Sequence, residues 1–135
     1  MNAAPAGYSG TPLPKKLGII KEGTRVALIG APPGFELGDL PAGATLRRGA
    51  SGAVDLTLWF VRSQKELLGG VQKMALRSAK SGLWIVWTKK TSPLAGDVSE
   101  GDVRGAGLAA GMVDFKICAV DHDWSGLRFN LRDRK

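Results

Sequence analysis

Cysteine and histidine are nearly absent from this chain. Its 135 residues include one of each, Cys118 and His122. A single cysteine excludes an internal disulfide, and one cysteine with one histidine falls short of the ligand set of a structural zinc site. We therefore expect a fold that needs neither a disulfide nor a metal ion.

Long hydrophobic stretches are also missing. The longest uncharged apolar runs, such as 83–87, are far shorter than the roughly 20 residues that span a bilayer. The first ten residues have neither the basic start nor the apolar centre of a secretory signal. These absences predict a cytoplasmic protein with no membrane span.

What the chain does have is the composition of one folded domain. Hydrophobic residues make up 44% and charged residues 23% of it, close to the average of soluble globular proteins. A chain of this length is enough for one hydrophobic core. Residues 1–10 are small, polar and rich in glycine, which predicts a flexible arm, and residues 11–135 are predicted to form a single domain.

Positive charge clearly exceeds negative charge. Nineteen lysine and arginine residues against twelve aspartate and glutamate residues give a net charge of +7, which favours an anionic small molecule, an acidic protein or nucleic acid as partner. Two basic groups could contact phosphates without reading sequence: Lys73, Arg77 and Lys80 on a predicted helix, and Arg128, Arg132, Arg134 and Lys135 near the C-terminus. A solvated helix face and a frayed terminus explain them as well, and no recognised nucleic-acid-binding motif is present.

The hydrophobic pattern alternates between short apolar runs and amphipathic segments. Helix starts are predicted where a capping pair precedes the helical repeat, at Ser63 with Glu66 and at Ser99 with Asp102. The predicted elements, in order, are a short helix over 11–18, strands over 25–29, 44–48 and 53–61, a helix over 63–82, a strand over 83–87, a helix over 99–111, and strands over 113–120 and 127–131. This order predicts an α/β fold: a small Rossmann-like, mostly parallel sheet with helices on both faces and a C-terminal antiparallel hairpin at its edge.

Parallel sheets bind ligands beyond the carboxyl ends of their strands, where helix N-termini and loops gather. Arg62, Lys89 and Lys90 follow two of these ends and would give the edge a positive charge suited to a phosphate or carboxylate. The predicted ligand-binding residues are Tyr8, Ser9, Gly30, Arg62, Ser63, Lys89 and Lys90, with Tyr8 as a lid if the N-terminal arm folds over this rim. The alternative is that the lysines are ordinary solvated charges at a strand end.

The glycine-containing segment 30–34 does not match a phosphate-binding loop. It has neither G-x-G-x-x-G nor G-K-[ST], and Pro32 and Pro33 remove N–H donors that such a loop uses. No acidic residue follows Arg47 and Arg48 to bind a ribose diol. These departures disfavour ordinary nucleotide binding, and the sequence does not identify a cofactor.

No set of catalytic residues is recognisable. His122 lies between two aspartates in a predicted turn, which suits either a general base or a plain polar turn residue. Cys118 lies in an apolar strand and is predicted to be a small buried hydrophobe. Trp124, in the same turn as His122, either caps the hairpin or meets a partner.

Several motifs resemble those of one bacterial family. They are GYSGTPL at 7–13, KLGI at 16–19, RVALIGAP at 25–32, FVRS at 60–63, GLWIVW at 82–87 followed by two lysines, VD at 113–114, CAVD at 118–121 and WSGLRF at 124–129. In these motifs the chain resembles the bacterial domain-of-unknown-function family numbered 3052, which implies no reaction. More distantly, the strand order and final hairpin are similar to the core of class I S-adenosylmethionine methyltransferases, although 28–33 lacks the acidic and glycine-rich pattern that those enzymes use for their cofactor.

These features predict a small protein without catalytic function that binds an anionic ligand or partner at the carboxyl edge of its sheet. One alternative is a degenerate or unusual transferase of the S-adenosylmethionine-dependent type, using the 30–35 loop. Another is a sequence-independent nucleic-acid accessory protein.

Overall fold

The structure is a computed structural model of the chain. It describes residues 22–32, 35, 42–49, 54–77, 82–93, 95–120 and 123–131. The predicted arm over 1–10, with Tyr8 and Ser9, the predicted helix over 11–18, and His122 lie outside the described residues.

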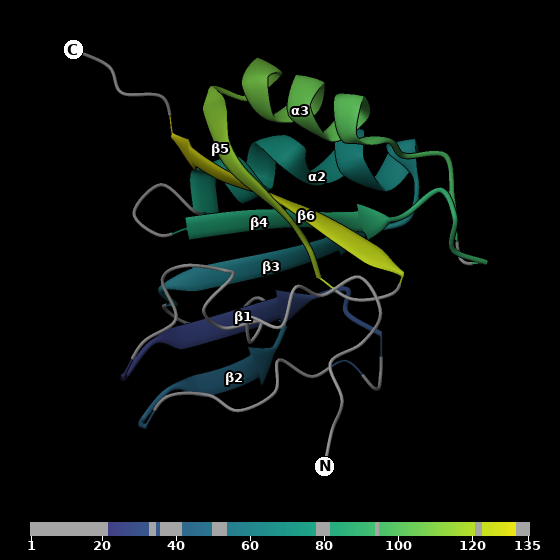
Figure 1. Cartoon of the computed structure of the whole chain (residues 1–135). Coiled ribbons are helices and arrows are strands. Elements are labelled where there is room, and N and C mark those ends of the chain that lie inside the picture. Colours follow the sequence, from purple (N-terminus) through teal and green to yellow (C-terminus); the bar gives the residue numbers. More distant parts are fainter. Residues whose placement is uncertain are drawn as a thin grey trace.

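The described chain forms one mixed sheet and two helices (Figure 1). The elements follow in the order β1 (Arg25–Ile29), β2 (Thr45–Arg48), β3 (Leu56–Val61), α2 (Gln64–Arg77), β4 (Gly82–Thr88), α3 (Glu100–Ala109), β5 (Met112–Ala119) and β6 (Trp124–Leu131). The strand order across the sheet is β2-β1-β3-β4-β6-β5. Strands β1 to β4 pair in parallel, and β6 is antiparallel to both β4 and β5. The predicted mostly parallel α/β sheet with a C-terminal antiparallel pair is confirmed.

One detail of the C-terminal hairpin was left open by the sequence, and a second differs from the prediction. Strand β6 lies between β4 and β5, so the antiparallel strand is inside the sheet and β5 forms the edge. The strand also starts at Trp124, three residues earlier than predicted, because Trp124 pairs with Thr88 and its carbonyl accepts a hydrogen bond of 2.8 Å from the N–H of Val120. The connection between β5 and β6 is thus shorter than the turn predicted over 121–126.

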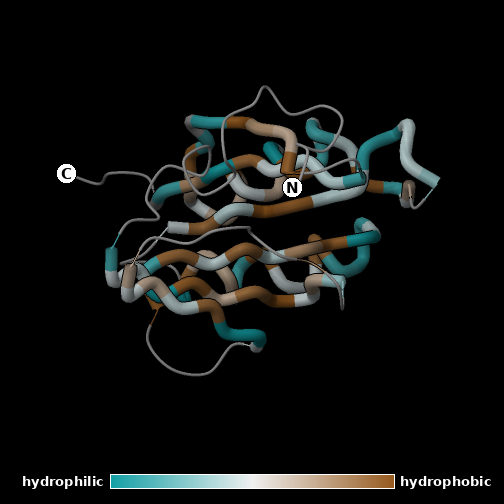
Figure 2. The backbone as a smooth tube through the Cα atoms, turned by 60° about the horizontal axis from the view of Figure 1, so that its bottom comes forward, coloured by the Kyte–Doolittle hydropathy of each residue, from teal (hydrophilic) through white to brown (hydrophobic). Residues whose placement is uncertain are grey.

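The two central strands are apolar along their whole length because both of their faces are covered. Every residue of β3 and β4 is buried, and Figure 2 shows hydrophobic segments running along the strands of the sheet. On one face, which we call the helix side, Val61, Trp87 and Leu127 pack against buried residues of α2 and α3, such as Leu67 and Val103.

The opposite face of the sheet carries a second cluster that includes Phe35, Phe60, Trp84, Val86 and Trp124. Both described helices belong to the helix side, so a helix on this opposite face stays a prediction, since the segment expected to supply it lies outside the described residues. No helix in the described ranges is long and apolar enough to cross a membrane.

An ion pair joins the starts of β1 and β3 at the amino edge of the sheet. The carboxylate of Asp55 accepts hydrogen bonds from the Arg25 backbone N–H at 2.8 Å and from its guanidinium at 3.1 Å. The Arg25 side chain, and then its backbone N–H, hold the pKa of Asp55 below the usual 3.8. A carboxylate with a lowered pKa stabilises the fold at higher pH, and this contribution is lost as the pH falls through the folded-state pKa.

Asp55→Asn is therefore expected to lower the thermal midpoint at neutral pH while leaving it nearly unchanged in strong acid. The two midpoint curves should begin to converge as the pH falls through about 4 and should meet once the pH is below the lowered pKa of Asp55, because the folded carboxylate is then protonated and the pair no longer exists. Thermal unfolding of both proteins followed by circular dichroism from pH 2 to 7 measures this. A difference that stays constant down to pH 2 would contradict the role assigned to Asp55.

Candidate functional site

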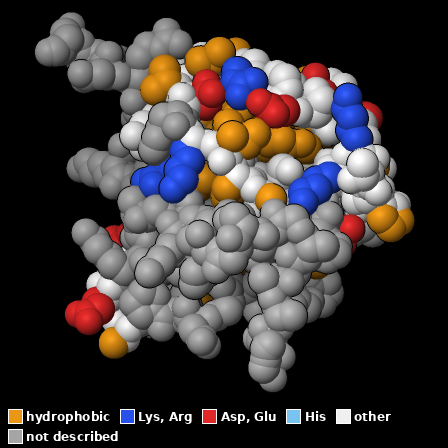
Figure 3. Space-filling view, in the orientation of Figure 1, with side chains coloured by type: hydrophobic (Ala, Val, Ile, Leu, Met, Phe, Trp, Pro, Cys, Tyr) orange, Lys and Arg blue, Asp and Glu red, His pale blue; other side chains and the backbone are white. Residues whose placement is uncertain are grey.

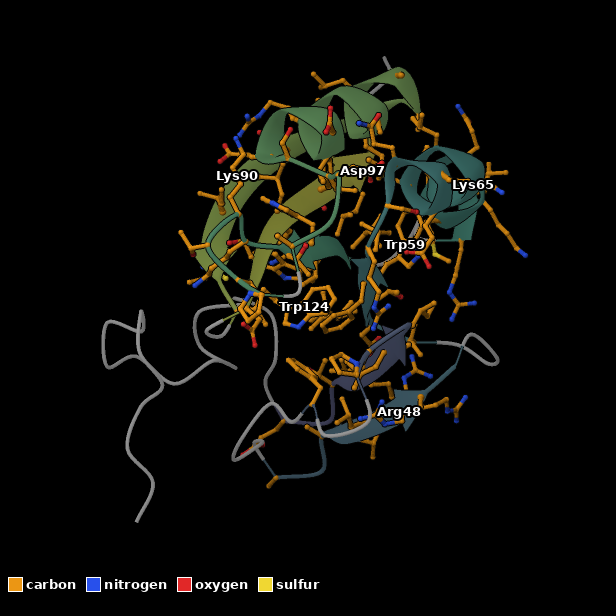
Figure 4. All side chains as sticks on the ribbon, turned by 90° about the vertical axis from the view of Figure 1, so that its right-hand side faces the viewer. Arg48, Trp59, Lys65, Lys90, Asp97 and Trp124 are labelled. Atoms are coloured by element: carbon orange, nitrogen blue, oxygen red, sulfur yellow. The ribbon has the colours of Figure 1, made fainter. Side chains whose placement is uncertain are left out.

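The carboxyl ends of the parallel strands meet at the edge of the sheet that faces the viewer in Figure 4. Val61 of β3 pairs with Trp87 of β4, so the residues that follow them leave the sheet side by side. Arg62 and Lys89 therefore lie at the same edge, as the sequence predicted. Their side chains take different faces of the sheet, however, and this divides the predicted rim into two parts.

The turn that carries Lys89 and Lys90 is held at both ends by hydrogen bonds. The backbone N–H of Lys89 donates to the carbonyl of Asp123 at 2.8 Å, and the N–H of Ser92 donates to the carbonyl of Lys89 at 3.0 Å. The hydroxyl of Ser92 also donates to the Asp123 carboxylate at 2.8 Å. The turn after β4 is thus tied to the connection between β5 and β6, which fixes where the two lysines leave the backbone.

Lys89 and Lys90 lie on a pocket of about 550 Å³, within the size range of small-molecule sites. Its lining residues are Trp87, Lys89, Lys90, Thr91, Ser99, Glu100, Gly101, Ile117 and Ser125. Trp87 and Ser125 are direct partners in the β4–β6 register, and Ile117 pairs with Leu127 on the helix side. The pocket therefore lies on the helix side of the sheet, between the exit of β4, the start of α3 and strand β5.

The start of α3 forms one wall of this pocket. Ser99 caps the helix: its hydroxyl accepts a hydrogen bond from the N–H of Asp102 at 3.2 Å, and the Asp102 carboxylate accepts one from the N–H of Ser99 at 2.9 Å. This capping box is as predicted. The positive end of the α3 dipole lies at the pocket, which adds to the field of the two lysines.

One acidic residue, Glu100, also lines the pocket, but it has a partner. Its carboxylate pairs with Arg104 one helical turn later at 2.8 Å, and Arg104 also binds Asp114 of β5 at 2.9 Å. These two carboxylates raise the pKa of Arg104, with Asp114 as the larger cause. Among the described residues, by contrast, neither Lys89 nor Lys90 has an ion-pair partner. The pocket keeps a positive excess.

Arg62 does not contribute to this pocket. Its guanidinium carbon lies 5.2 Å from the ring centre of Trp124, within cation–π range, on the face opposite the helices. The Trp124 ring meets Phe60 edge-on at 5.1 Å, and Phe60 meets Phe35 at 4.9 Å. Arg62 thus covers an aromatic cluster, and Trp124 is a buried first residue of β6 rather than a residue of the turn.

Ser63 is the N-cap of α2, and the chain itself fills the anion position at that helix start. The Ser63 hydroxyl accepts from the N–H of Glu66 at 3.1 Å, while an Asp97 oxygen accepts from the N–H of Gln64 at 2.8 Å. The predicted capping box is offset by one residue, because the Glu66 carboxylate accepts from Arg62 N–H at 2.6 Å rather than from the cap. An external anion would have to displace these carboxylates.

Gly30 lies where the strand order changes direction, between β1 and β3. Its φ of 77° is a left-handed conformation, and a Cβ there would lie 2.8 Å from the carbonyl oxygen of Phe60. Beside it, the guanidinium of Arg48, at the end of β2, donates to the carbonyls of Ala31 at 3.4 Å and Phe35 at 3.2 Å. These contacts explain why glycine occupies position 30 without assigning it a role in ligand binding.

Of the five predicted residues that the structure describes, two, Lys89 and Lys90, come together in a pocket. Figure 4 labels Lys90 at this edge. The alternation of side chains along a strand could have separated Arg62 from Lys89. Val61 and Trp87 both face the helix side. Lys89 follows Trp87 by two residues and returns to that side, whereas Arg62 follows Val61 by one residue and takes the opposite side. The contributions of Ile117 and Ser125 to the pocket were not predicted from the sequence. In the described ranges, no group of three or more His, Cys, Asp or Glu residues could hold a metal ion.

One basic residue assigned to a phosphate-contacting tail is in fact inside the sheet. Arg128 belongs to β6 and is 8% exposed, and burial lowers the pKa of its guanidinium. It cannot present its charge to a nucleic-acid backbone as a frayed terminus would. Lys80, Arg132, Arg134 and Lys135 lie outside the described residues.

Comparison with known proteins identifies the fold. No family model matches the chain, and no curated protein matches it. A SAM dependent methyltransferase from Aquifex aeolicus has a TM-score of 0.58 at 18% identity, over 85% of this chain and 85% of that one. A pericyclic reaction enzyme, and LepI in complex with SAM, each have a TM-score of 0.51 at 12% identity, covering 98% of this chain and 50% of theirs. The chain is similar in fold to these structures and spans half the length of the latter two.

Proposed function

We propose that this protein binds a small anionic molecule in the pocket at the exit of β4, on a methyltransferase-like core and without catalysing a reaction. The observation that carries the proposal is the placement of Lys89 and Lys90, two lysines without an ion-pair partner among the described residues, in a pocket of about 550 Å³ beside the start of α3. Two cations beside a helix N-terminus favour charge-assisted contacts to a phosphate or carboxylate.

The lining of the pocket supports binding more than catalysis. No histidine or cysteine occurs among its described lining residues, and the hydroxyl of Ser99 is engaged in the capping box. Glu100 is paired with Arg104. A nucleophile next to a base, the usual requirement for covalent catalysis, is therefore not found in this lining.

The test is charge reversal of both lysines, measured by calorimetric titration with inorganic phosphate at fixed ionic strength. The double variant Lys89→Glu and Lys90→Glu is expected to lose at least about tenfold in affinity, while the free energy of unfolding changes by no more than about 0.5 kcal/mol, since both side chains are at the surface.

A second double variant, Lys65→Glu and Lys73→Glu, controls for the effect of net charge on phosphate affinity. Both residues are exposed lysines of α2. Figure 4 shows Lys65 on a different side of the molecule from Lys90. This control carries the same change of four charge units, and its phosphate affinity should stay within about twofold because surface charges are screened beyond about 8 Å at physiological salt. Equal losses in the two double variants would overturn the proposal.

A transferase of the S-adenosylmethionine-dependent type is the second candidate, favoured by the structural similarity to methyltransferases. In open α/β sheets such a cofactor would lie at the change of strand order, outside β1 and β3. The described residues there do not fit it well: the guanidinium of Arg48 donates to the carbonyls of Ala31 and Phe35 in the segment after β1, and Phe35 is packed against Phe60. We derive no reaction step from this candidate.

Calorimetry with S-adenosylmethionine separates the two candidates. The proposal predicts no saturable binding that depends on the β1 exit. Saturable binding that is kept in the Lys89 and Lys90 double variant would favour the transferase. Membership of the domain-of-unknown-function family numbered 3052 and a cytoplasmic location remain predictions, as do an acidic protein partner and a nucleic-acid partner. A lid formed by Tyr8 and a ligand contact from Ser9 also remain predictions.

A further inference from the structure

The pocket at the exit of β4 contains more than its two cations. Ile117 of β5 lines it and leaves 49% of its surface exposed, which is a large exposure for an isoleucine in a strand. In the space-filling view, hydrophobic side chains reach the surface among basic and acidic ones in the region where Figure 1 draws α3 and β5 (Figure 3). The pocket therefore joins an apolar wall to a cationic rim.

The positive charge and the apolar surface lie in different parts of the pocket. Lys89 and Lys90 leave the turn after β4, whereas Ile117 stands on the edge strand, with β6 between β4 and β5. Ser125, between them in the sheet, offers a hydroxyl on the pocket floor. An anion held by the lysines would extend any attached group across Ser125 toward Ile117.

The volume of the pocket also suits a ligand larger than a simple inorganic ion. A pocket of about 550 Å³ is much larger than an inorganic phosphate or an acetate needs, and it falls in the range that holds organic molecules. Lysine binds such anionic groups as a point charge without demanding a planar, two-point geometry, so the lysines alone would not set specificity. The apolar wall is then the part that distinguishes one anion from another.

We propose that the ligand is a small organic anion, a phosphate or carboxylate attached to a compact apolar group that contacts Ile117. This inference rests on the proposed function, since it takes Lys89 and Lys90 as the anion-binding residues. It excludes a bare inorganic ion as the preferred ligand.

The test compares matched pairs of probes by calorimetric titration: phenyl phosphate against inorganic phosphate, and benzoate against acetate. At least one apolar member is expected to bind the wild type about tenfold or more tightly than its small counterpart, since burying a few carbon atoms gives about this factor. The pair that shows the preference identifies the anionic group.

Variants of Ile117 test whether this side chain causes the preference for the aromatic probe. Ile117→Ser is expected to weaken the preferred aromatic probe about fivefold or more and to leave inorganic phosphate unchanged, whereas Ile117→Val, which keeps an apolar wall, should lose no more than about twofold. If neither aromatic probe binds more tightly than its counterpart, or if Ile117→Ser weakens both members of a pair equally, the inference is wrong while the proposed function stands. If no probe binding depends on Lys89 and Lys90, the proposed function fails instead.

Discussion

Gly107→Ala is expected to destabilise the protein by about 1 to 2 kcal/mol, even though alanine is the better helix former. Gly107 lies in α3 where the helix meets β6, and a Cβ there would overlap the ring of Phe129, approaching its Cζ to 2.6 Å. Phe129 is fully buried, so its ring has no free space to move into. The cost of overpacking a filled core, about 1 to 3 kcal/mol, outweighs the gain of up to about 1 kcal/mol in helix propensity.

Gly105, two residues earlier in the same helix, is the matched control. No atom lies within 4 Å of a Cβ built there, so Gly105→Ala should gain the helix propensity without the clash and stabilise the protein by about 0.5 to 1 kcal/mol. Urea unfolding of the two variants and the wild type gives both values. Stabilisation by both changes would show that α3 does not pack on Phe129 as described.

Trp124→Ala is expected to cost about 3 to 5 kcal/mol, the range for removing a large buried aromatic side chain. Trp124 is 2% exposed, meets Phe60 edge-on at 5.1 Å and lies under the guanidinium of Arg62. Its loss removes apolar burial and leaves the Arg62 cation without its aromatic partner. This is a large part of the total stability of a domain of this size.

Trp124→Phe keeps the prediction testable if the alanine variant does not fold. Phenylalanine retains an aromatic ring for both Phe60 and Arg62, so its cost should be less than half of that of alanine. Guanidinium unfolding at constant pH measures both variants. Losses below about 1 kcal/mol for alanine would indicate that Trp124 is a surface residue of the hairpin turn, which the sequence had left open.

The sequence predicted the central strands well because their signal is local. Strands β1 and β4 match the predicted segments to within one residue at each end, since a short β-branched or aromatic run bounded by glycine and lysine has few other interpretations. The start of β6 was harder, because Asp123, Ser125 and Gly126 have the composition of a turn although Ser125 and Gly126 are paired in the sheet. Tertiary pairing overrode local propensity there.

The candidate site was predictable only in part for a related reason. Lys89 and Lys90 could be placed at a carboxyl edge from the order of elements alone. The contribution of Ile117 depends on β6 lying between β4 and β5, and a hairpin in the sequence does not say which of its strands joins the sheet. The engagement of the α2 start by Asp97 comes from a residue 33 positions away from Gln64, which no local pattern shows.

The central claim is that the ligand site lies at the exit of β4 on the helix side, and not at the β1 exit where the strand order changes. Backbone amide shifts of the full-length ¹⁵N-labelled protein, titrated with phenyl phosphate at constant ionic strength, test it most directly. The account predicts saturable shifts at 89–91, at 99–101 and at Ser125. Shifts concentrated at Gly30, Ala31 and Arg48, or an absence of saturable shifts at the exit of β4, would contradict it.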